Sequence, residues 1–215
     1  MKGTLKVLII MAIFSLKSAF GATPEQGFWK WFQKNENEFF NFEQDQENIF
    51  NKLAARMSKV NDNLTFEFGP ITDVGKREFV ISAGGIKAAF PLVESLHSAA
   101  PNLEKWVFMK YRSRRVPLHD LEFSGVSVAV ANVHYKMYKD DNKVGILVFI
   151  EGQNEEQADL YANIGYLFLD EALGEYDVET KVGFIEIHNR QSKHYEGASP
   201  LSELASDLDA YYQSH

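Results

Sequence analysis

The sequence predicts an α+β fold in which helices pack on a mostly antiparallel sheet. Two stretches, 64–112 and 133–187, each contain a hairpin-like pair of strands, a helical segment and a further strand. The segment before them, 22–62, carries aromatic residues at helical spacing. We therefore expect two hairpin-helix-strand halves, alike in element order only, with an N-terminal aromatic helical segment packed on their sheet.

The first 21 residues have the form of a secretory signal peptide. Lys2 and Lys6 supply the positive region, Val7–Phe14 the apolar run and Ala19–Gly21 the small residues of a cleavage site. The apolar run is much shorter than the ~20 residues that span a bilayer. We expect export to the periplasm or medium and a mature chain, 22–215, that forms a single domain without a membrane span. An uncleaved anchor is the alternative.

The composition limits the classes of function. With 45% hydrophobic residues the chain has enough apolar side chains to form a core, so it is not disordered by composition. The chain has no Cys, which excludes disulfides and thiol nucleophiles. Its formal charge of −8 becomes −11 when Lys2, Lys6 and Lys17 are removed with the signal. An acidic chain is a poor match for the phosphate backbone of nucleic acids.

The aromatic segment should begin as a helix at Thr23. Thr23 can cap the helix, Pro24 suits its first position, and Gln26 completes a capping box. One helix face then carries Phe28, Phe32 and Phe39. A second helix is expected over about 43–60. We interpret the aromatic face as the contact with the sheet; a ligand, partner or self-association surface is the alternative.

Each half is then expected to follow the same order of elements. In the first half we predict strands 64–68 and 77–83, a helix over 86–99 that contains Pro91, and a strand over 106–112. In the second we predict strands 126–130, 133–138 and 144–150, a helix capped by Asn154 that ends at Gly174, an acidic loop, and a strand over 182–187. A polar loop over 189–199 and a closing helix over 200–211, with Leu201, Leu204 and Leu208 inward, complete the chain.

One dense cationic run stands out in this acidic chain. Its members are Lys110, Arg112, Arg114 and Arg115. In a strand, the first three project from one face. Guanidinium groups bind phosphates and carboxylates through two hydrogen bonds, so the run is a candidate site for an anionic group. The alternative is that these cations neutralise the protein's own acids.

The acids that would neutralise the run lie between residues 170 and 179. They are Asp170, Glu171, Glu175, Asp177 and Glu179. Paired carboxylates act as acid and base or hold a hard cation, but the spacing matches no calcium loop. Solvated acids at a helix end and in a loop are the simpler interpretation. We take Glu175, Asp177 and Glu179, together with the cationic run, as the candidate binding residues.

Histidines and one glycine turn give weaker signals. Glu186 and His188 share a strand face, and His119 lies near two acids, so a hydrolase-like His–carboxylate pair is a second hypothesis. Zinc ligation is not required by any spacing, and we predict no metal and no cofactor. The backbone N–H groups of 82–85, between a strand and a helix, form either a plain turn or a small anion site.

Three blocks of the sequence resemble an uncharacterised bacterial family of exported or cytosolic α+β proteins. The blocks are Phe28–Phe32 with Asn35-Glu36, Phe90–Glu94 through Pro101 to Trp106 and Arg112, and Leu169-Asp170 through Gly174 to Glu179. The resemblance spans most of the mature chain and implies a single domain. The family carries no assigned activity, so no catalytic residue is transferred from it.

These observations lead to an expected function. We expect an exported binding or interaction domain whose contact surface is the run Lys110–Arg115 with the acids near it. Its partner would be a protein or an anionic small ligand. A hydrolase-like enzyme is the alternative.

Overall fold

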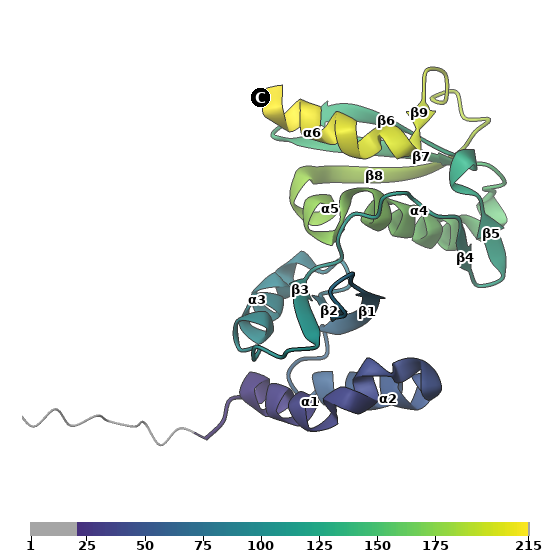
Figure 1. Cartoon of the computed structure of the whole chain (residues 1–215). Helices are drawn as coiled ribbons and strands as arrows, with labels where there is room; N and C mark the ends of the chain where they lie inside the picture. The colour runs from purple at the N-terminus through teal and green to yellow at the C-terminus, as the bar shows by residue number, and fades with distance from the viewer. Residues whose placement is uncertain (1–20, 215) are drawn as a thin grey trace, which may run out of the picture.

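The protein has the α+β fold that the sequence predicts. The structure, a computed structural model, describes residues 21–214, and the predicted signal peptide therefore falls almost entirely outside the described residues. Within 21–214, no helix combines the length and the apolar character that crossing a membrane requires. Helices and strands form two units, each around its own hydrophobic core, and Figure 1 shows the first unit below the second.

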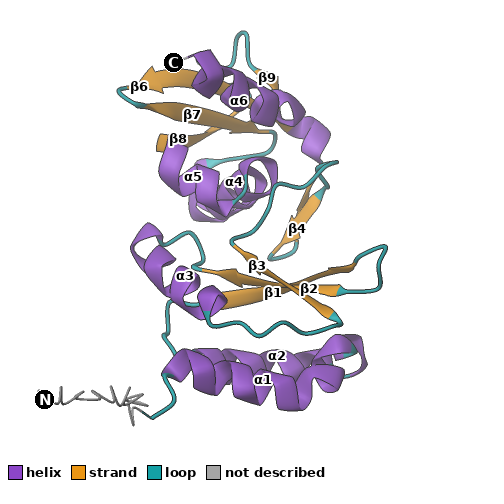
Figure 2. Ribbon diagram, turned by 60° about the vertical axis from the view of Figure 1, so that its left-hand side comes forward, coloured by secondary structure: helices purple, strands orange, loops and turns teal. Residues whose placement is uncertain are grey.

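The first unit combines helices with a three-stranded sheet. Its elements are α1 (Pro24–Phe40), a 3-10 turn at Phe42–Gln44, α2 (Gln46–Met57), β1 (Thr65–Ile71), β2 (Arg77–Ser82), a 3-10 turn at Lys87–Ala89, α3 (Phe90–Ser98) and β3 (Trp106–Lys110). In Figure 2, α1 and α2 cover one face of this sheet, and α4 and α5 of the second unit lie beyond its other face.

The second unit is built around a four-stranded sheet. Its elements are β4 (Leu121–Phe123), β5 (Val126–Val128), a 3-10 turn at Val130–Asn132, β6 (Val133–Asp140), β7 (Lys143–Ile150), a 3-10 turn at Glu155–Gln157, α4 (Ala158–Leu173), α5 (Glu175–Lys181), β8 (Val182–Asn189), β9 (Ser199–Pro200), a 3-10 turn at Leu201–Glu203 and α6 (Leu204–Ser214). Strands β4 and β5 form a separate two-stranded ribbon.

Both halves share one topology. In the first, β1 and β2 form an antiparallel hairpin, and the chain crosses through α3 so that β3 pairs parallel to β2. In the second, β6 and β7 form the hairpin, and α4 and α5 lead to β8, which pairs parallel to β7. The predicted hairpin-helix-strand order is confirmed. The strands belong to separate sheets, ordered β1-β2-β3 and β8-β7-β6-β9.

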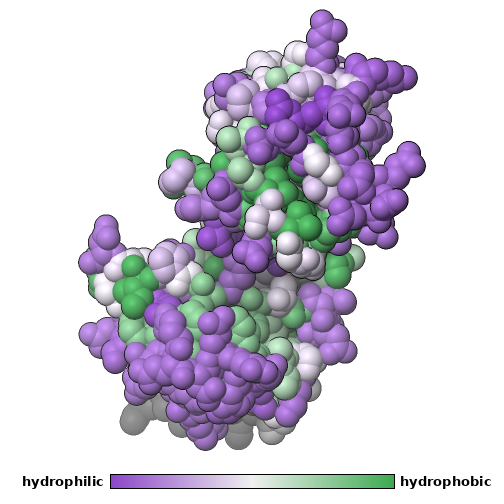
Figure 3. Space-filling view, turned by 90° about the vertical axis from the view of Figure 1, so that its right-hand side faces the viewer, coloured by the Kyte–Doolittle hydropathy of each residue, from purple (hydrophilic) through white to green (hydrophobic). Residues whose placement is uncertain are grey.

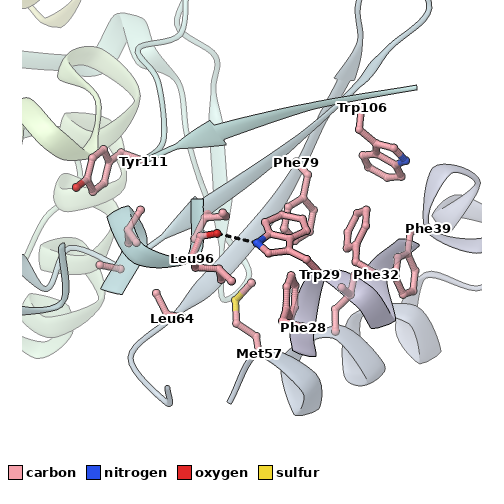
Figure 4. Close-up of a cluster of buried hydrophobic side chains, with 14 of the residues drawn as sticks. Phe28, Trp29, Phe32, Phe39, Met57, Leu64, Phe79, Leu96, Trp106 and Tyr111 are labelled. Carbon is pink, nitrogen blue, oxygen red and sulfur yellow. Dashed lines mark hydrogen bonds between the residues drawn. The ribbon is translucent and has the colours of Figure 1, made fainter. Parts of the chain in front are cut away.

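Aromatic rings fill the core of the first unit. The predicted stripe of α1 is buried: Phe28, Phe32 and Phe39 each have 0% exposure. Phe32 lies 5.0 Å from Phe79 of β2 and 4.9 Å from Trp106 of β3 between ring centroids. Figure 4 shows these rings in one cluster of buried side chains. Such edge-to-face pairs stabilise beyond simple area burial. The stripe therefore attaches α1 to the sheet, as predicted.

Hydrogen bonds of the buried Trp29 and of the exposed Thr23 also position α1. Trp29 donates from Nε1 to the carbonyl of Leu96 in α3 at 2.7 Å, the dashed line in Figure 4. Thr23 caps the helix and forms the predicted capping box with Gln26. The N-terminal part of α1 is thus fixed by hydrogen bonds as well as by packing.

The core of the second unit lies between its sheet and its helices. Strand β7 is the central strand and is buried from Val144 to Ile150. The predicted inward residues of the closing helical segment, Leu201, Leu204 and Leu208, have exposures of 0–1%. Ile164 and Phe168 of α4 are fully buried in the same cluster.

Two predicted boundaries were wrong in ways that affect the candidate site. Strand β1 continues to Ile71 through an irregularity after Phe68, where a stop at Gly69 was expected. Strand β3 ends at Lys110, because Tyr111 adopts a φ of 61° and turns the chain. Arg112 and Arg114 therefore lie in a loop and do not share a strand face with Lys110.

The aromatic core gives a direct stability prediction. Phe32→Ala removes a fully buried ring and should lower the free energy of unfolding by about 3–5 kcal/mol, measured by urea denaturation. Tyr166→Ala, on a side chain that is 48% exposed, is the control and should change it by less than about 0.5 kcal/mol. Equal effects of the two changes would contradict the role of the stripe.

Candidate functional site

A buried carboxylate joins the two units. Glu175 has 0% exposure and opens α5 directly after Gly174, whose φ of 79° turns the chain out of α4. Its Oε1 accepts hydrogen bonds from the backbone N–H groups of Ala83 at 2.9 Å and Gly85 at 3.2 Å. Its Oε2 accepts from the N–H of Arg112 at 3.2 Å. One side chain of the second unit thus binds two segments that follow strands of the first.

The glycine turn 82–85 does bind an anion, but the anion belongs to the protein. The backbone N–H groups of Ala83 and Gly85 point at the carboxylate of Glu175. Gly84 and Gly85 have φ values of 60° and 78°, which glycine adopts without strain. The turn therefore has a structural role in the junction of the units.

The acidic loop expected after Gly174 is a helix, α5. Glu175 and Asp177 occupy its first turn, where negative charge complements the partial positive charge of a helix N-terminus. Lys181 lies in its last turn and pairs with Asp177 at 3.0 Å, four residues earlier. The acids that suggested a loop are the residues that favour this short helix.

Arg112 and Arg114 form the closest ion pairs of the junction. Arg112 binds Glu67 of β1 at 2.6 Å and Asp170 of α4 at 2.8 Å. Arg114 binds Asp177 at 2.6 Å and Asp209 of α6 at 2.7 Å. Both guanidinium groups are thus engaged by the protein's own carboxylates, which is the alternative that the sequence left open.

Lys110 and Arg115 are bound less tightly to the junction. Lys110 pairs with Glu94 of α3 at 2.8 Å, away from the acids of α5. Arg115 lies 3.6 Å from Glu67 and 3.5 Å from Glu171, and its side chain is 54% exposed. At these longer distances an ion pair in contact with water contributes little. Arg115 is therefore the cation of the run that is most available to a ligand.

Two acids at the junction are harder to ionise than usual. Burial raises the pKa of Asp170 above its ordinary value, and Arg112 opposes that shift only in part. Burial also raises the pKa of Glu179, with the charge of Asp170 adding to the effect. Both raised pKa values thus result mainly from the removal of these carboxylates from water.

A cleft of about 860 Å³ opens between the units beside these ion pairs. One wall is the chain from Glu67 to Ile71, and the other runs from Arg112 to Val116. Residues at helical spacing on α4, Leu167, Asp170 and Glu171, form a third side. The remaining lining residues are Phe42, Glu43, Arg77, Glu78, Val80, His119 and Leu121. Figure 3 shows the surface from this side, where the molecule is narrower between the two units than across either unit.

Five consecutive residues of β1 line the cleft, from Glu67 to Ile71. Glu78 and Val80 of the central strand β2 line it as well, so the cleft extends over the face of the sheet as far as the outer strand β1. Strand β1 is the outer strand of its sheet and pairs with β2 on one side. Its other side therefore presents unpaired backbone groups toward the cleft.

The far end of the cleft is formed by a buried arginine. Arg77 is 6% exposed, and its guanidinium lies 4.8 Å from the ring centre of Phe42. It binds Glu43 at 2.7 Å, but its Nε has no hydrogen-bond partner among the described residues. Oε2 of Glu171 is likewise buried without a partner in that part of the chain.

A second, smaller cavity of about 280 Å³ lies beside the cationic run. Lys110, Arg112, Arg114 and Asp177 of the predicted set line it, together with Gly174 and Tyr176. Tyr176 is 50% exposed and stacks on Phe90 of α3. Glu175 and Glu179 do not line either cavity.

The histidines are divided between two places. His188 bonds Glu186 at 2.9 Å on the strand face that the sequence predicted, and neither residue lines a cavity described above. His119 lines the large cleft. Over residues 21–214, no three His, Cys, Asp or Glu side chains are grouped so as to hold a metal ion.

Several residues of the cleft were missed by the sequence analysis. Glu67 alternates with apolar residues in β1, whereas Arg77 and Glu78 are adjacent at the start of β2, and all three were taken only as polar positions of a hairpin. Asp209, a partner of Arg114, was one of several acids in the closing helix. One sequence signal could have identified this part of the cleft. Glu67 is a charged residue within a strand and is followed by Gly69 and Pro70, a combination that is typical of a strand at a sheet edge.

Comparisons of the chain with protein-family models, with curated proteins and with solved structures found no match. The resemblance to a bacterial family therefore stays an expectation. Functional inference for this chain depends on its own geometry.

The junction predicts a strong effect of changing Glu175. Glu175→Ala leaves three N–H groups unpaired at a buried position and should lower the free energy of unfolding by about 3–6 kcal/mol. Glu175→Gln should not restore the lost stability, because the NH₂ group of the glutamine would face at least one backbone N–H donor. Both effects are measured by urea denaturation.

Glu179→Gln is the matched control on the same helix. Because burial already raises the pKa of Glu179, removal of its charge should leave stability unchanged or raise it. A loss as large as that of Glu175→Ala would show that the effect belongs to any change in α5.

Asp170 and Asp209 should respond to pH in opposite directions. The pKa of Asp170 is raised in the folded state, so protonation as the pH falls toward its ordinary value of 3.8 stabilises the fold. The hydrogen bond from Arg114 lowers the pKa of Asp209, so its contribution is lost as the pH falls through that lowered value.

Urea unfolding between about pH 7 and pH 3 measures both effects. As the pH falls, the free energy of unfolding of Asp170→Asn should decrease relative to that of the wild type, because the variant lacks the stabilising protonation. The free energy of unfolding of Asp209→Asn should increase relative to that of the wild type, because the variant has no ionised Asp209 to lose. The same sign of change for both variants would contradict the assignment.

Proposed function

We propose that this protein is an exported binding domain that holds its ligand in the cleft between its two units. The observation that carries the proposal is the cleft itself. Its volume of about 860 Å³ lies within the range of ligand sites in proteins, roughly 300–1,000 Å³. Such sites occur preferentially where two packed units meet.

The lining supports binding. Apolar side chains, among them Ile71 and Val116 with exposures of 49% and 93%, stand at the cleft beside charged groups. Burial of such apolar surface is the main source of affinity, and the charged groups orient the ligand. The ion pairs of Arg112 fix the two walls relative to each other.

Export supplies the setting of the proposal. The N-terminal signal pattern supports it. The ligand would accordingly be met in the periplasm or medium.

The class of ligand follows from how the cations are used. An anionic small ligand on Lys110–Arg115 would have to displace carboxylates that already bind Arg112 and Arg114 at 2.6–2.8 Å. Only Arg115 is half-exposed, and it lies between Glu67 and Glu171. We therefore favour a protein partner over an anionic small ligand.

The hydrolase hypothesis has one observation in its favour, the bond between His188 and Glu186. This pair lies outside the cleft, and the histidine that lines the cleft, His119, has no hydrogen bond to a carboxylate among the described residues. The substrate-sized space and the His–carboxylate pair are thus in different places. This separation supports the binding proposal.

A filled cleft tests the proposal. In Leu167→Trp a larger ring enters the cleft from α4, whereas Tyr166→Trp changes the adjacent, exposed residue outside it. Two probe panels, short peptides and small carboxylates or phosphates, are screened by thermal unfolding. A ligand at about 100 times its Kd should raise the Tm of wild type and Tyr166→Trp by about 5–10 °C, and that of Leu167→Trp much less.

The outcome that contradicts the proposal is equally clear. If neither panel stabilises the wild type, or if every stabilising probe acts equally on both variants, the cleft is not a binding site.

A further inference from the structure

We propose that the occupant of the cleft is an extended, basic segment of a partner protein that pairs with the free edge of β1. This inference rests on the proposed function and names its ligand. Two features carry it: the strand edge in the cleft wall and the excess of carboxylates in the lining.

The strand edge offers a line of backbone hydrogen bonds. Strand β1 pairs with β2 alone, and the cleft touches every residue from Glu67 to Ile71. No other segment among the described residues forms a backbone hydrogen bond to this stretch. An added strand satisfies such an edge through main-chain bonds, a common mode of peptide recognition.

The edge is open over only part of its length. Pro70 lacks an N–H group, and the register with β2 is irregular between Phe68 and Ile71. Proline and irregular pairing both limit edge-to-edge association of whole sheets. The edge is thus suited to a short segment held in the cleft more than to unlimited strand addition.

The charge of the lining favours a basic segment. Five carboxylates line the cleft, those of Glu43, Glu67, Glu78, Asp170 and Glu171. Of the four arginines that line it, Arg114 is bound by Asp177 and Asp209, which lie outside the lining. The five carboxylates are therefore shared by three guanidinium groups. A Lys or Arg side chain of the partner would complete this balance.

Glu78 is the strongest single candidate for that contact. It forms no ion pair among the residues that the structure describes, although it lines the cleft. Gly69 of β1 makes room for it, because a Cβ at that position would lie 2.7 Å from its Oε2. A glycine in the strand edge thus lets a carboxylate lie directly beside the path of an added strand.

The apolar lining suits the alternation of a strand. Val80, Leu121 and Leu167 lie in the lining together with the carboxylates. Side chains of an extended segment alternate between two faces, so basic and apolar residues in turn would meet these two kinds of surface. Six residues span roughly 20 Å, the length of a typical strand.

The test uses the mature chain and labelled eight-residue peptides. One peptide alternates Val and Lys, the second alternates Val and Glu, and two others are the basic peptide with N-methyl groups on one backbone edge or on the other. Fluorescence anisotropy gives the Kd of each. The basic peptide should bind more tightly than the acidic one, and N-methylation of one edge alone should weaken binding about tenfold, through the loss of two or more hydrogen bonds.

Two protein variants locate the contact. Glu78→Gln should weaken binding of the basic peptide about threefold to tenfold, whereas Glu156→Gln, an exposed acid outside the cleft, should leave it unchanged. Thermal unfolding of each variant without peptide shows that the fold is intact. If Glu78→Gln unfolds, the N-methylated peptides still decide the question, because they leave the protein unchanged.

Each other outcome overturns the inference. Tighter binding of the acidic peptide, equal loss with both N-methylated peptides, or no loss with either would exclude a basic strand on the edge of β1. A ligand that Leu167→Trp displaces but that is neither basic nor extended would overturn this inference and leave the proposed function standing. Peptide binding that is unaffected by Leu167→Trp would overturn both.

Discussion

The carboxylate of Glu175 is the interaction on which the rest of the structure depends. It is fully buried and binds the N–H groups that follow β2 and β3, although it belongs to the second unit. A buried charge without such partners would cost several kcal/mol. Its three donors are backbone groups, so the geometry is fixed by the chain and not by flexible side chains. This one residue therefore sets the position of α5, and with it α4, above the first sheet.

The cleft is a consequence of that junction. With α4 held above the sheet, Asp170 reaches Arg112, and Arg112 reaches Glu67 on the edge strand. These ion pairs lie beside the space between the units, and the continuation of β1 to Ile71 extends one wall of that space toward Arg77. The same acids that hold the units together leave more carboxylates than cations around the space, which is why the site favours a positively charged ligand.

Most of the elements were predictable because their signals are local. The aromatic face of α1, the capping box at Thr23 and the exit at Gly174 are properties of neighbouring residues, and all three were predicted correctly. The two hairpins follow from alternation and turn residues in the same way. The order hairpin, helix, strand in each half was therefore available from the sequence.

The site was only partly predictable because it depends on contacts between distant residues. The sequence identified Arg112, Arg114, Asp170 and Asp177, yet it could not show that they bind one another. The left-handed conformation of Tyr111 moved the arginines off the strand, and a non-glycine residue gives no local warning of such a turn. The edge position of β1 depends on which strands pair, and pairing is a property of the whole sheet.

Amide hydrogen exchange along β1 is the most direct measurement of the central claim. The mature chain is compared without peptide and with a saturating amount of the alternating Val/Lys peptide. The account predicts that the outward-facing amides between Thr65 and Ile71 exchange at least about tenfold more slowly with peptide, whereas those of β8 do not change. Unchanged exchange along β1 at saturation, or protection confined to another strand, would contradict it.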